Sequence, residues 1–176
     1  REYGFSIWEN IQSILDKKFK EDGTKNAYFP LLIPESLLNK ESEHFKGFTP
    51  EVFWVTKIGD NDIENKLAIR PTSEAIAYES YAKWIKSWRD LPLKINFWNT
   101  ALRAEIKATK PFLRTSEFLW QEGHTAHATK EEAIDETKQM VNIYAKFAED
   151  FMAMPVVIGT KTESERFAGA LETYTI

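Results

Sequence analysis

The 176-residue chain contains no cysteine, which excludes disulfide bonds and thiolate metal sites and leaves the sequence compatible with the cytoplasm. It has no unbroken apolar run near the roughly 20 residues that a membrane-spanning helix needs, and its first residues, from Arg1 to Tyr3, do not start a secretory signal. P-loop and G-x-G-x-x-G motifs are missing, as is a Ser-His-Asp arrangement in a recognisable context. We therefore expect a soluble cytoplasmic protein outside the familiar nucleotide-binding folds, with no membrane partner.

An excess of basic charge is also lacking. The formal net charge is -4, which argues against a surface that coats nucleic acid generally, because phosphate neutralisation needs clustered Lys and Arg. Apolar side chains, in contrast, are abundant: 43% of residues are hydrophobic and 14% aromatic, including six Trp and twelve Phe. This composition predicts a folded core, and the length suits one domain or a piece of a larger protein.

Apolar periodicity and turn residues divide the chain into expected elements. Helices are expected from 5 to about 22, over 35–45, about 73–88 and 130–152, and strands over 27–33, 51–56, 66–70, 93–105, 115–122 and 155–158. Pro30 makes the first of these strands an edge strand or one interrupted by a bulge. Because helices are inserted between antiparallel strand pairs, the order of elements predicts an α+β fold.

The first chemical motif is the run from Arg70 to Glu74, R-P-T-S-E, at a turn between a strand and a helix. A hydroxyl at Thr72 and a carboxylate at Glu74 could together bind a small cationic amine through hydrogen bonds and charge. The competing interpretation is an ordinary helix cap, because T-S-x and S-x-x-E patterns are common at helix N-termini.

The second motif is a basic loop between two expected strands. Arg103 ends the first strand, Lys107 and Lys110 lie in the loop, and Arg114 opens the partner strand. Two arginines and a basic loop could grip a polyphosphate, since the guanidinium fork matches phosphate oxygens in bidentate geometry. A solvated hairpin with surface ion pairs would have the same charge pattern.

The third motif is F-L-W-Q-E-G-H, residues 118–124. Side chains alternate along a strand, so Phe118, Trp120, Glu122 and His124 should share one face. A carboxylate beside these rings suits an amine with an apolar ring, although a half-buried structural strand would look alike. The H-x-x-H spacing of His124 and His127 does not lead us to expect a metal, because the sequence shows no third or fourth ligand nearby.

Taken together, R-P-T-S-E, L-R-A-E (102–105), P-F-L-R-T-x-E-F (111–118) and L-W-Q-E-G-H (119–124) resemble the prolyl-tRNA synthetase family of the archaeal and eukaryotic type. N-A-Y-F-P (26–30), G-F-x-P-E-V-x-W-V-T (47–56) and F-A-G-A (167–170) extend the resemblance over nearly the whole chain. It implies a class II aminoacyl-tRNA synthetase catalytic core, a mostly antiparallel sheet flanked by helices. The implied activity is ATP-dependent activation of L-proline, with Mg²⁺ accompanying ATP, and transfer to the 3′ end of tRNA(Pro) by a homodimer.

The resemblance also implies a role for each matching residue. Thr72 and Glu74 would hold the proline nitrogen, and Arg103 would contact both the substrate carboxylate and the α-phosphate as the catalytic residue. The ring pocket would be lined by Phe48, Trp120, Glu122 and His124, and the nucleotide would be contacted by Arg103, Glu105, Arg114, Thr115 and Phe118.

Some features depart from the family pattern. Glu2 stands where proline is expected, and Ala104 replaces an aromatic residue of the second motif. We expect residues 1–176 to form one partial catalytic domain that lacks the third motif and the anticodon-binding domain, and that by itself could be inactive. Two alternatives stay open: a non-catalytic binding or regulatory module, and a class II synthetase for another small amino acid such as threonine or serine. The absence of Cys/His zinc ligands and the pairing of Trp120 with Glu122 count against the second alternative.

Overall fold

The computed structural model describes residues 1–40, 52–104, 107–167 and 169–176. Its helices are α1 (Glu2–Glu21), α2 (Glu35–Lys40), α4 (Glu74–Trp84) and α5 (Lys130–Met152), with short 3-10 turns η2 (Trp88–Asp90) and η3 (Glu163–Glu165). The strands are β1 (Lys25–Asn26), β2 (Leu32–Pro34), β3 (Trp54–Ile58), β4 (Asn61–Ile69), β5 (Leu93–Leu102), β6 (Glu117–Ala126), β7 (Gly159–Thr160) and β8 (Tyr174–Thr175). This mixture of helices and mainly antiparallel strands confirms the predicted α+β class.

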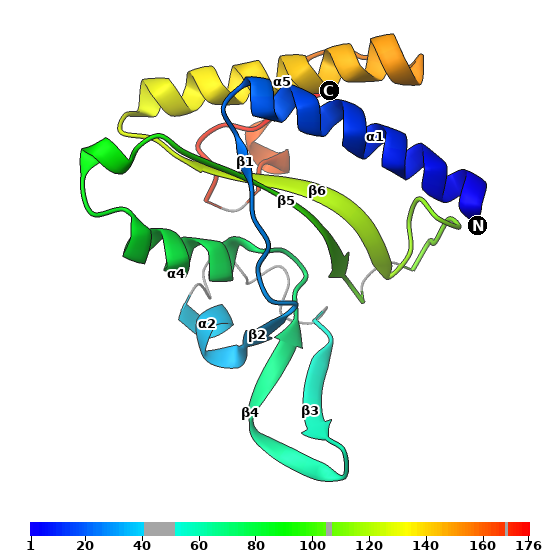
Figure 1. The fold of residues 1–176 in the computed structure, drawn as a ribbon, viewed down its shortest axis with the longest axis vertical. Helices are drawn as coiled ribbons and strands as arrows, with labels where there is room; N and C mark the ends of the chain where they lie inside the picture. The colour runs from blue at the N-terminus through cyan, green and yellow to red at the C-terminus, as the bar shows by residue number, and fades with distance from the viewer. Residues whose placement is uncertain (41–51, 105–106, 168) are drawn as a thin grey trace.

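The central sheet has the order β1-β5-β6. Strands β5 and β6 pair antiparallel from Leu93↔Ala126 to Leu102↔Glu117 without a break, and β1 runs parallel to β5. Helices α1 and α5 cover one face of this sheet, and α4 lies against the other (Figure 1). The sheet is therefore the middle of three layers.

Different residues of β5 build the apolar contacts on its two faces. Trp98 packs beside a buried cluster of Leu15 and Phe19 of α1 with Phe147 of α5. Phe97, on the opposite face, joins a second cluster that includes Tyr81 of α4. Strand alternation thus lets one ten-residue strand support both helical layers.

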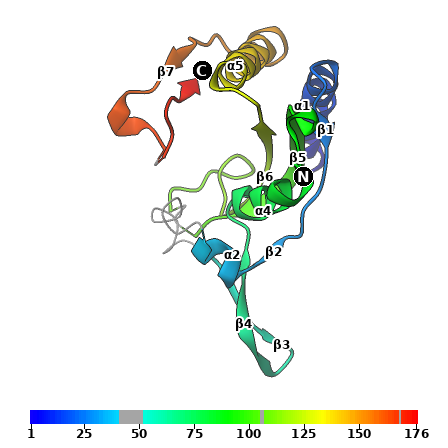
Figure 2. The same cartoon turned by 90° about the vertical axis from the view of Figure 1, so that its left-hand side faces the viewer.

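The second sheet has the order β2-β4-β3, and its β3–β4 hairpin extends away from the α1 and α5 layer (Figure 2). Arg70, which follows β4 and is fully buried, connects the two sheets. Its Nε donates to the Thr100 carbonyl at 2.8 Å and its NH1 to the Phe29 carbonyl at 2.7 Å. The segment that follows Arg70 is thereby held against the end of β5.

The expected elements were largely found, and the strand bounds changed most. A continuous strand over 27–33 is wrong: β1 ends at Asn26 and β2 begins at Leu32, because Pro30 has no N–H for a ladder. The third helix ends at Trp84 rather than 88, where the chain turns before η2. The last expected strand lies at 159–160 rather than 155–158. None of the helices among the described residues is long and apolar enough to cross a membrane.

Candidate active site

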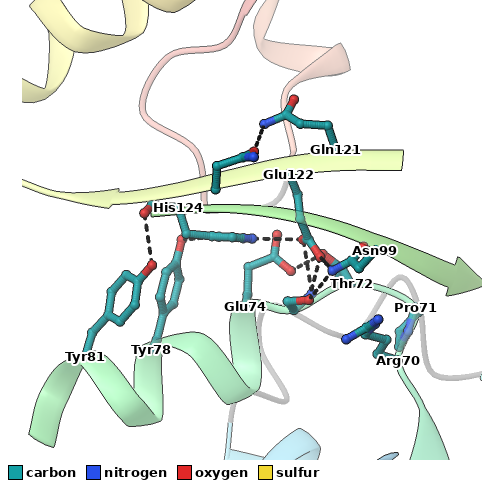
Figure 3. Close-up of polar contacts among 12 residues, drawn as sticks. Arg70, Pro71, Thr72, Glu74, Tyr78, Tyr81, Asn99, Gln121, Glu122 and His124 are labelled. Carbon is teal, nitrogen blue, oxygen red and sulfur yellow. Dashed lines mark hydrogen bonds and ion pairs between the residues drawn. The ribbon is translucent and has the colours of Figure 1, made fainter. Parts of the chain in front are cut away.

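Two segments form the candidate site on the face of the central sheet that α4 covers. The turn between β4 and α4 supplies Thr72, Ser73 and Glu74, and β6 supplies Glu122 and His124 (Figure 3). Thr72, Ser73, Glu122 and His124 are all buried. Residues about 50 positions apart in the sequence therefore meet at one point.

The Glu122 carboxylate is surrounded by hydrogen-bond donors. Its Oε1 accepts from Ser73 Oγ at 2.5 Å and from Asn99 Nδ2 at 3.0 Å. Its Oε2 lies 2.8 Å from His124 Nε2 and 3.2 Å from both the Ser73 N–H nitrogen and Thr72 Oγ1. A buried carboxylate with this many donors can remain charged.

The electrostatics of Glu122 follow from two opposing effects. Burial alone would raise its pKa, but hydrogen bonds from His124, Asn99 and Ser73 together outweigh burial and hold the pKa of this carboxyl below its ordinary value. Tyr81, also close by, donates its hydroxyl to the His124 carbonyl at 3.0 Å, and burial raises the pKa of that phenol. The site therefore presents an ionised acid surrounded by hydrogen-bond donors near neutral pH.

A second carboxylate lies next to the first. Glu74 Oε2 accepts a hydrogen bond from Thr72 Oγ1, and the ligand atoms of Glu74, Glu122 and His124 lie within 4.8 Å of one another. Two acids and a hydroxyl at this spacing form a compact acceptor site for a cation. The predicted proximity of Thr72 and Glu74 is thus observed. The helix-cap alternative does not hold for Ser73, because this N-cap residue makes no side-chain cap bond.

Arg103 closes another side of this site just after β5. Its Nε donates to the Pro71 carbonyl at 3.0 Å, and its guanidinium carbon lies 5.1 Å from the ring centre of Trp120 and 5.5 Å from that of Phe118. The carbonyl and the two rings together orient the guanidinium. The shared face predicted for Phe118 and Trp120 is confirmed by their 5.7 Å ring separation.

These groups line a cavity of about 370 Å³, whose volume suits a small metabolite rather than a large one. Its lining is Thr72, Glu74, Arg103, Trp120, Gln121, Glu122, Gly123, His124, Tyr144 and Phe167. The lining therefore includes two acids that can attract a cation and a guanidinium that can attract an anion. That combination fits a zwitterion such as an amino acid.

Other predicted residues are placed elsewhere. Arg114 is on an exposed part of the β5–β6 loop, where its backbone pairs with Lys110, and it is not among the residues lining this cavity. Thr115 and Phe118 line a neighbouring cavity of about 400 Å³ beside Trp8 of α1. The roles expected for Phe48 and Glu105 fall on residues outside the described ones.

The absence of further ligands near His124 and His127, from which no metal was expected, is wrong for His124. Folding does bring Glu74 and Glu122 to His124, so a third ligand type is nearby, whereas His127 Nε2 lies 3.0 Å from Thr125 Oγ1 and belongs to no such group of described residues. However, the donors already around Glu122 equal or exceed the lone pairs of one carboxylate. This donor set fits a hydrogen-bonded acid better than a vacant metal site.

Ser73 and Asn99 are the functional candidates that sequence reasoning missed. Ser73 was weighed only as a helix cap, and Asn99 lies within a strand, four residues before Arg103. The register of the β5–β6 pair places Asn99 opposite Trp120, which is two residues from Glu122 on β6. Knowledge of this register would have indicated that Asn99 lies near the site.

Comparisons with known proteins agree on one family. A model of the tRNA synthetase class II core domain (G, H, P, S and T) matches residues 53–174. The chain is 61% identical over 173 residues to the proline–tRNA ligase of Cenarchaeum symbiosum and 62% identical over 174 residues to that of Alkaliphilus oremlandii. Those alignments cover 98% and 99% of the chain, respectively, and in each case 36% of the ligase.

A solved structure has a similar fold. The chain superposes on the prolyl-tRNA synthetase of Cryptosporidium parvum, complexed with halofuginone and AMPPNP, with a TM-score of 0.93 and 51% identity. The superposition covers 99% of the chain and 34% of that protein. The chain thus spans about a third of the length of the relatives it matches.

Proposed function

This chain belongs to the class II tRNA synthetase core family (G, H, P, S and T), and from that premise we propose that it is the proline-binding part of a proline–tRNA ligase. The fold of the class II core agrees with what the sequence motifs predicted. The observation that carries the proposal is that Thr72, Glu74, Glu122, Trp120 and Arg103 line one and the same cavity. The whole reaction would convert L-proline and ATP to prolyl-adenylate, and then esterify the 3′ end of tRNA(Pro).

Each end of the cavity has a part in this proposal. Proline at neutral pH carries a secondary ammonium with two N–H donors, which match the acceptors of Thr72 and Glu74 and the charge of Glu122. Its ring would lie against Trp120 and His124. Its carboxylate would face Arg103, the group we propose as catalytic.

Activation of the carboxylate needs no general base, because a carboxylate nucleophile is already ionised at pH 7. Arg103 would place this nucleophile and neutralise charge that develops on the α-phosphate, so placement and electrostatics supply the rate. Mg²⁺ would enter as the counter-ion of ATP and supply further charge neutralisation. The nucleotide, beyond the cavity, would be contacted by Arg114, Thr115 and Phe118.

Binding of an amino-acid panel to this chain tests the proposal. Calorimetry with L-proline, L-alanine, L-serine and L-threonine should give binding of L-proline at least tenfold tighter than the others. Equal binding of serine or threonine would favour a synthetase for another small amino acid, and binding of none would overturn the proposal. Proline binding without ATP binding would favour the non-catalytic module.

A homodimer, expected from the family resemblance, is tested by sedimentation of the same sample.

A further inference from the structure

Ser73 occupies the N-cap position of α4 but does not cap the helix. An ordinary N-cap serine accepts a hydrogen bond from an N–H in the first turn of its own helix. Ser73 instead donates its hydroxyl to Glu122 Oε1 at 2.5 Å, and its N–H to Glu122 Oε2 at 3.2 Å. The carboxylate of a distant strand thus lies at the positive end of the α4 dipole, in the place of the usual cap.

Asn99 is also directed toward the same carboxylate. Its side chain is 7% exposed, and its Nδ2 donates to Glu122 Oε1 at 3.0 Å and contacts Ser73 Oγ at 3.3 Å. Its Oδ1 is buried and has no hydrogen-bond partner among the residues that the structure describes. A buried amide with an unsatisfied carbonyl is unfavourable by itself, so its contribution lies in the N–H donors that it offers to Glu122.

We propose that Ser73 and Asn99 are positioning residues that hold the Glu122 carboxylate in one orientation, ionised, at the amine end of the cavity. The inference rests on the proposed function, since proline is the ligand whose ammonium that charge would meet. It adds two residues to the recognition of the amino acid, neither of which lines the cavity itself.

The charges around Glu122 make such donors necessary. Burial disfavours its ionised form, and the carboxyl group of Glu74 lies within 4.8 Å. The titratable and charged groups that face Glu122 are Glu74, Tyr78 and Tyr81 from α4, His124 from β6, and Arg103 beyond β5. His124 bonds directly to the carboxylate, and Ser73 and Asn99 add donors from the α4 turn and from β5.

Direct titration of Glu122 by NMR tests this inference without any ligand. In the chain labelled at the glutamate δ-carbon, Glu122→Gln identifies the resonance by its loss. Asn99→Leu and the milder Ser73→Ala should each move the Glu122 midpoint to higher pH, because a donor to the charged form is lost while burial remains. An unchanged midpoint in both variants would overturn the inference.

Asn96→Leu is the matched control. Asn96 is a buried asparagine on the same strand, but it faces the other side of the sheet, where its Nδ2 donates to Asn26 Oδ1 and its Oδ1 accepts from Gln121 Nε2. This variant should lower the melting temperature and leave the Glu122 midpoint where it is. If Asn99 had only a general structural role, Asn99→Leu and Asn96→Leu would affect the Glu122 midpoint equally.

Proline binding between about pH 3.5 and 8 gives a second readout. Because Glu122 must be ionised to attract the ammonium, affinity should fall as the pH drops through the Glu122 midpoint, and in Asn99→Leu this fall should begin at a higher pH. Between the two midpoints the variant should bind proline roughly tenfold more weakly than the wild-type chain, as expected from losing a hydrogen bond to a charged group. A fall of similar size at every pH would contradict the inference.

Tetrahydro-2-furoate, which has a ring oxygen in place of the amine, separates the two proposals. It carries no ammonium, so its binding should not differ between the wild-type chain and Asn99→Leu. If the wild-type chain binds neither compound, the proposed function fails, while the NMR titration still decides whether Ser73 and Asn99 control Glu122. A shifted midpoint with normal proline binding would reject Glu122 as the partner of the ammonium.

Discussion

At the scale of single residues, Arg103 is the group whose replacement is most informative. Its guanidinium donates to the Pro71 carbonyl and lies over the rings of Trp120 and Phe118, a geometry that a lysine ammonium cannot reproduce. Both Arg103→Ala and Arg103→Lys should therefore reduce proline-dependent ATP–pyrophosphate exchange by at least a hundredfold, about 2.7 kcal/mol of transition-state stabilisation.

The matched control for Arg103 is Arg89→Ala. Arg89 also lies over an aromatic ring, that of the exposed Trp88, at 5.1 Å, but it is in η2 at the far end of α4. Its replacement should leave exchange unchanged. Exchange close to normal in Arg103→Lys would reject the catalytic role that we propose for the guanidinium.

Lys94 gives a prediction about stability and pH. Its ammonium lies 2.5 Å from Glu136 Oε2 and 3.0 Å from Asp22 Oδ2, both buried carboxylates. Lys94→Met would leave two acids facing each other and should lower the free energy of unfolding by about 3 kcal/mol, measured in urea. Lys83→Met, which removes an exposed pair with Glu79, should change it by less than about 0.5 kcal/mol.

The pH dependence of Lys94 has a definite sign. Burial lowers its pKa, but Glu136 and Asp22 outweigh burial, so the pKa of this ammonium is raised above its ordinary value. A raised pKa gives stability that is fully present below the unfolded value of roughly 10.4 and is lost as the pH rises through the folded value. The urea concentration at the unfolding midpoint of the wild-type chain should therefore decrease as the pH rises above that value. In Lys94→Met the same rise in pH should decrease it much less.

How far the site could be predicted differs from residue to residue. Thr72, Glu74, Arg103 and Glu122 were identified because short motifs resemble a known family, and alternation along one strand placed Trp120 with Glu122. Asn99 could not be identified in this way. Its role depends on the register between β5 and β6, which the sequence of either strand leaves open.

At the scale of elements, α5 shows how a helix boundary can be read from the sequence. Thr129 is its N-cap: Oγ1 accepts from the Glu132 N–H at 3.2 Å, while Glu132 Oε2 accepts from the Ala128 N–H at 3.0 Å. This local signal lies within four residues, and the predicted bounds of 130–152 are confirmed. The long apolar face of the helix then packs Phe147 against α1.

Thr129→Ala tests the cap of α5. The loss of one bond at the N-terminus should lower the free energy of unfolding by about 1 kcal/mol, measured by thermal and urea unfolding. Thr137→Ala is the control, because Thr137 lies inside the same helix and its hydroxyl only donates to the Ala133 carbonyl. Equal losses in the two variants would contradict a capping role.

Strands were less predictable than helices because a strand's hydrogen-bond partners lie elsewhere in the sequence. In place of the expected strand over 27–33 there are two short strands in different sheets: β1 ends just before it and β2 begins near its end. Ala27, between them, donates its N–H to the Asn96 carbonyl of β5. A short apolar run does not record which partner each of its residues meets. Helices such as α1 and α5 contain their own hydrogen-bond partners and so depend less on distant residues.

At the scale of the whole molecule, Arg70 connects the two sheets. Its side chain is fully buried and donates to carbonyls of the 27–31 segment and of β5, while its own backbone pairs with Leu31 and Leu102. Arg70→Met should lower the free energy of unfolding by about 2 kcal/mol through loss of these two charge-assisted bonds.

Hydrogen exchange read by mass spectrometry should locate the effect of Arg70→Met. Amides of β2 and β4 should exchange faster, because their sheet loses its attachment to β5, whereas amides of α5 should change little. Arg166→Met is the control, since Arg166 also donates to a carbonyl, that of Leu171, but on an exposed surface. Uniformly faster exchange would indicate global destabilisation and reject a connecting role for Arg70.

The bond between Ser73 and Glu122 joins residues 49 positions apart. Closing a loop of that length costs chain entropy before any contact is gained, so this contact belongs to the late, nonlocal part of folding. The amine end of the cavity therefore cannot exist in a partly folded chain that has only its helices. Any ligand that binds there selects the fully assembled molecule and should raise its melting temperature as the logarithm of one plus the ratio of ligand concentration to Kd increases, which makes thermal shift a direct reporter of the site.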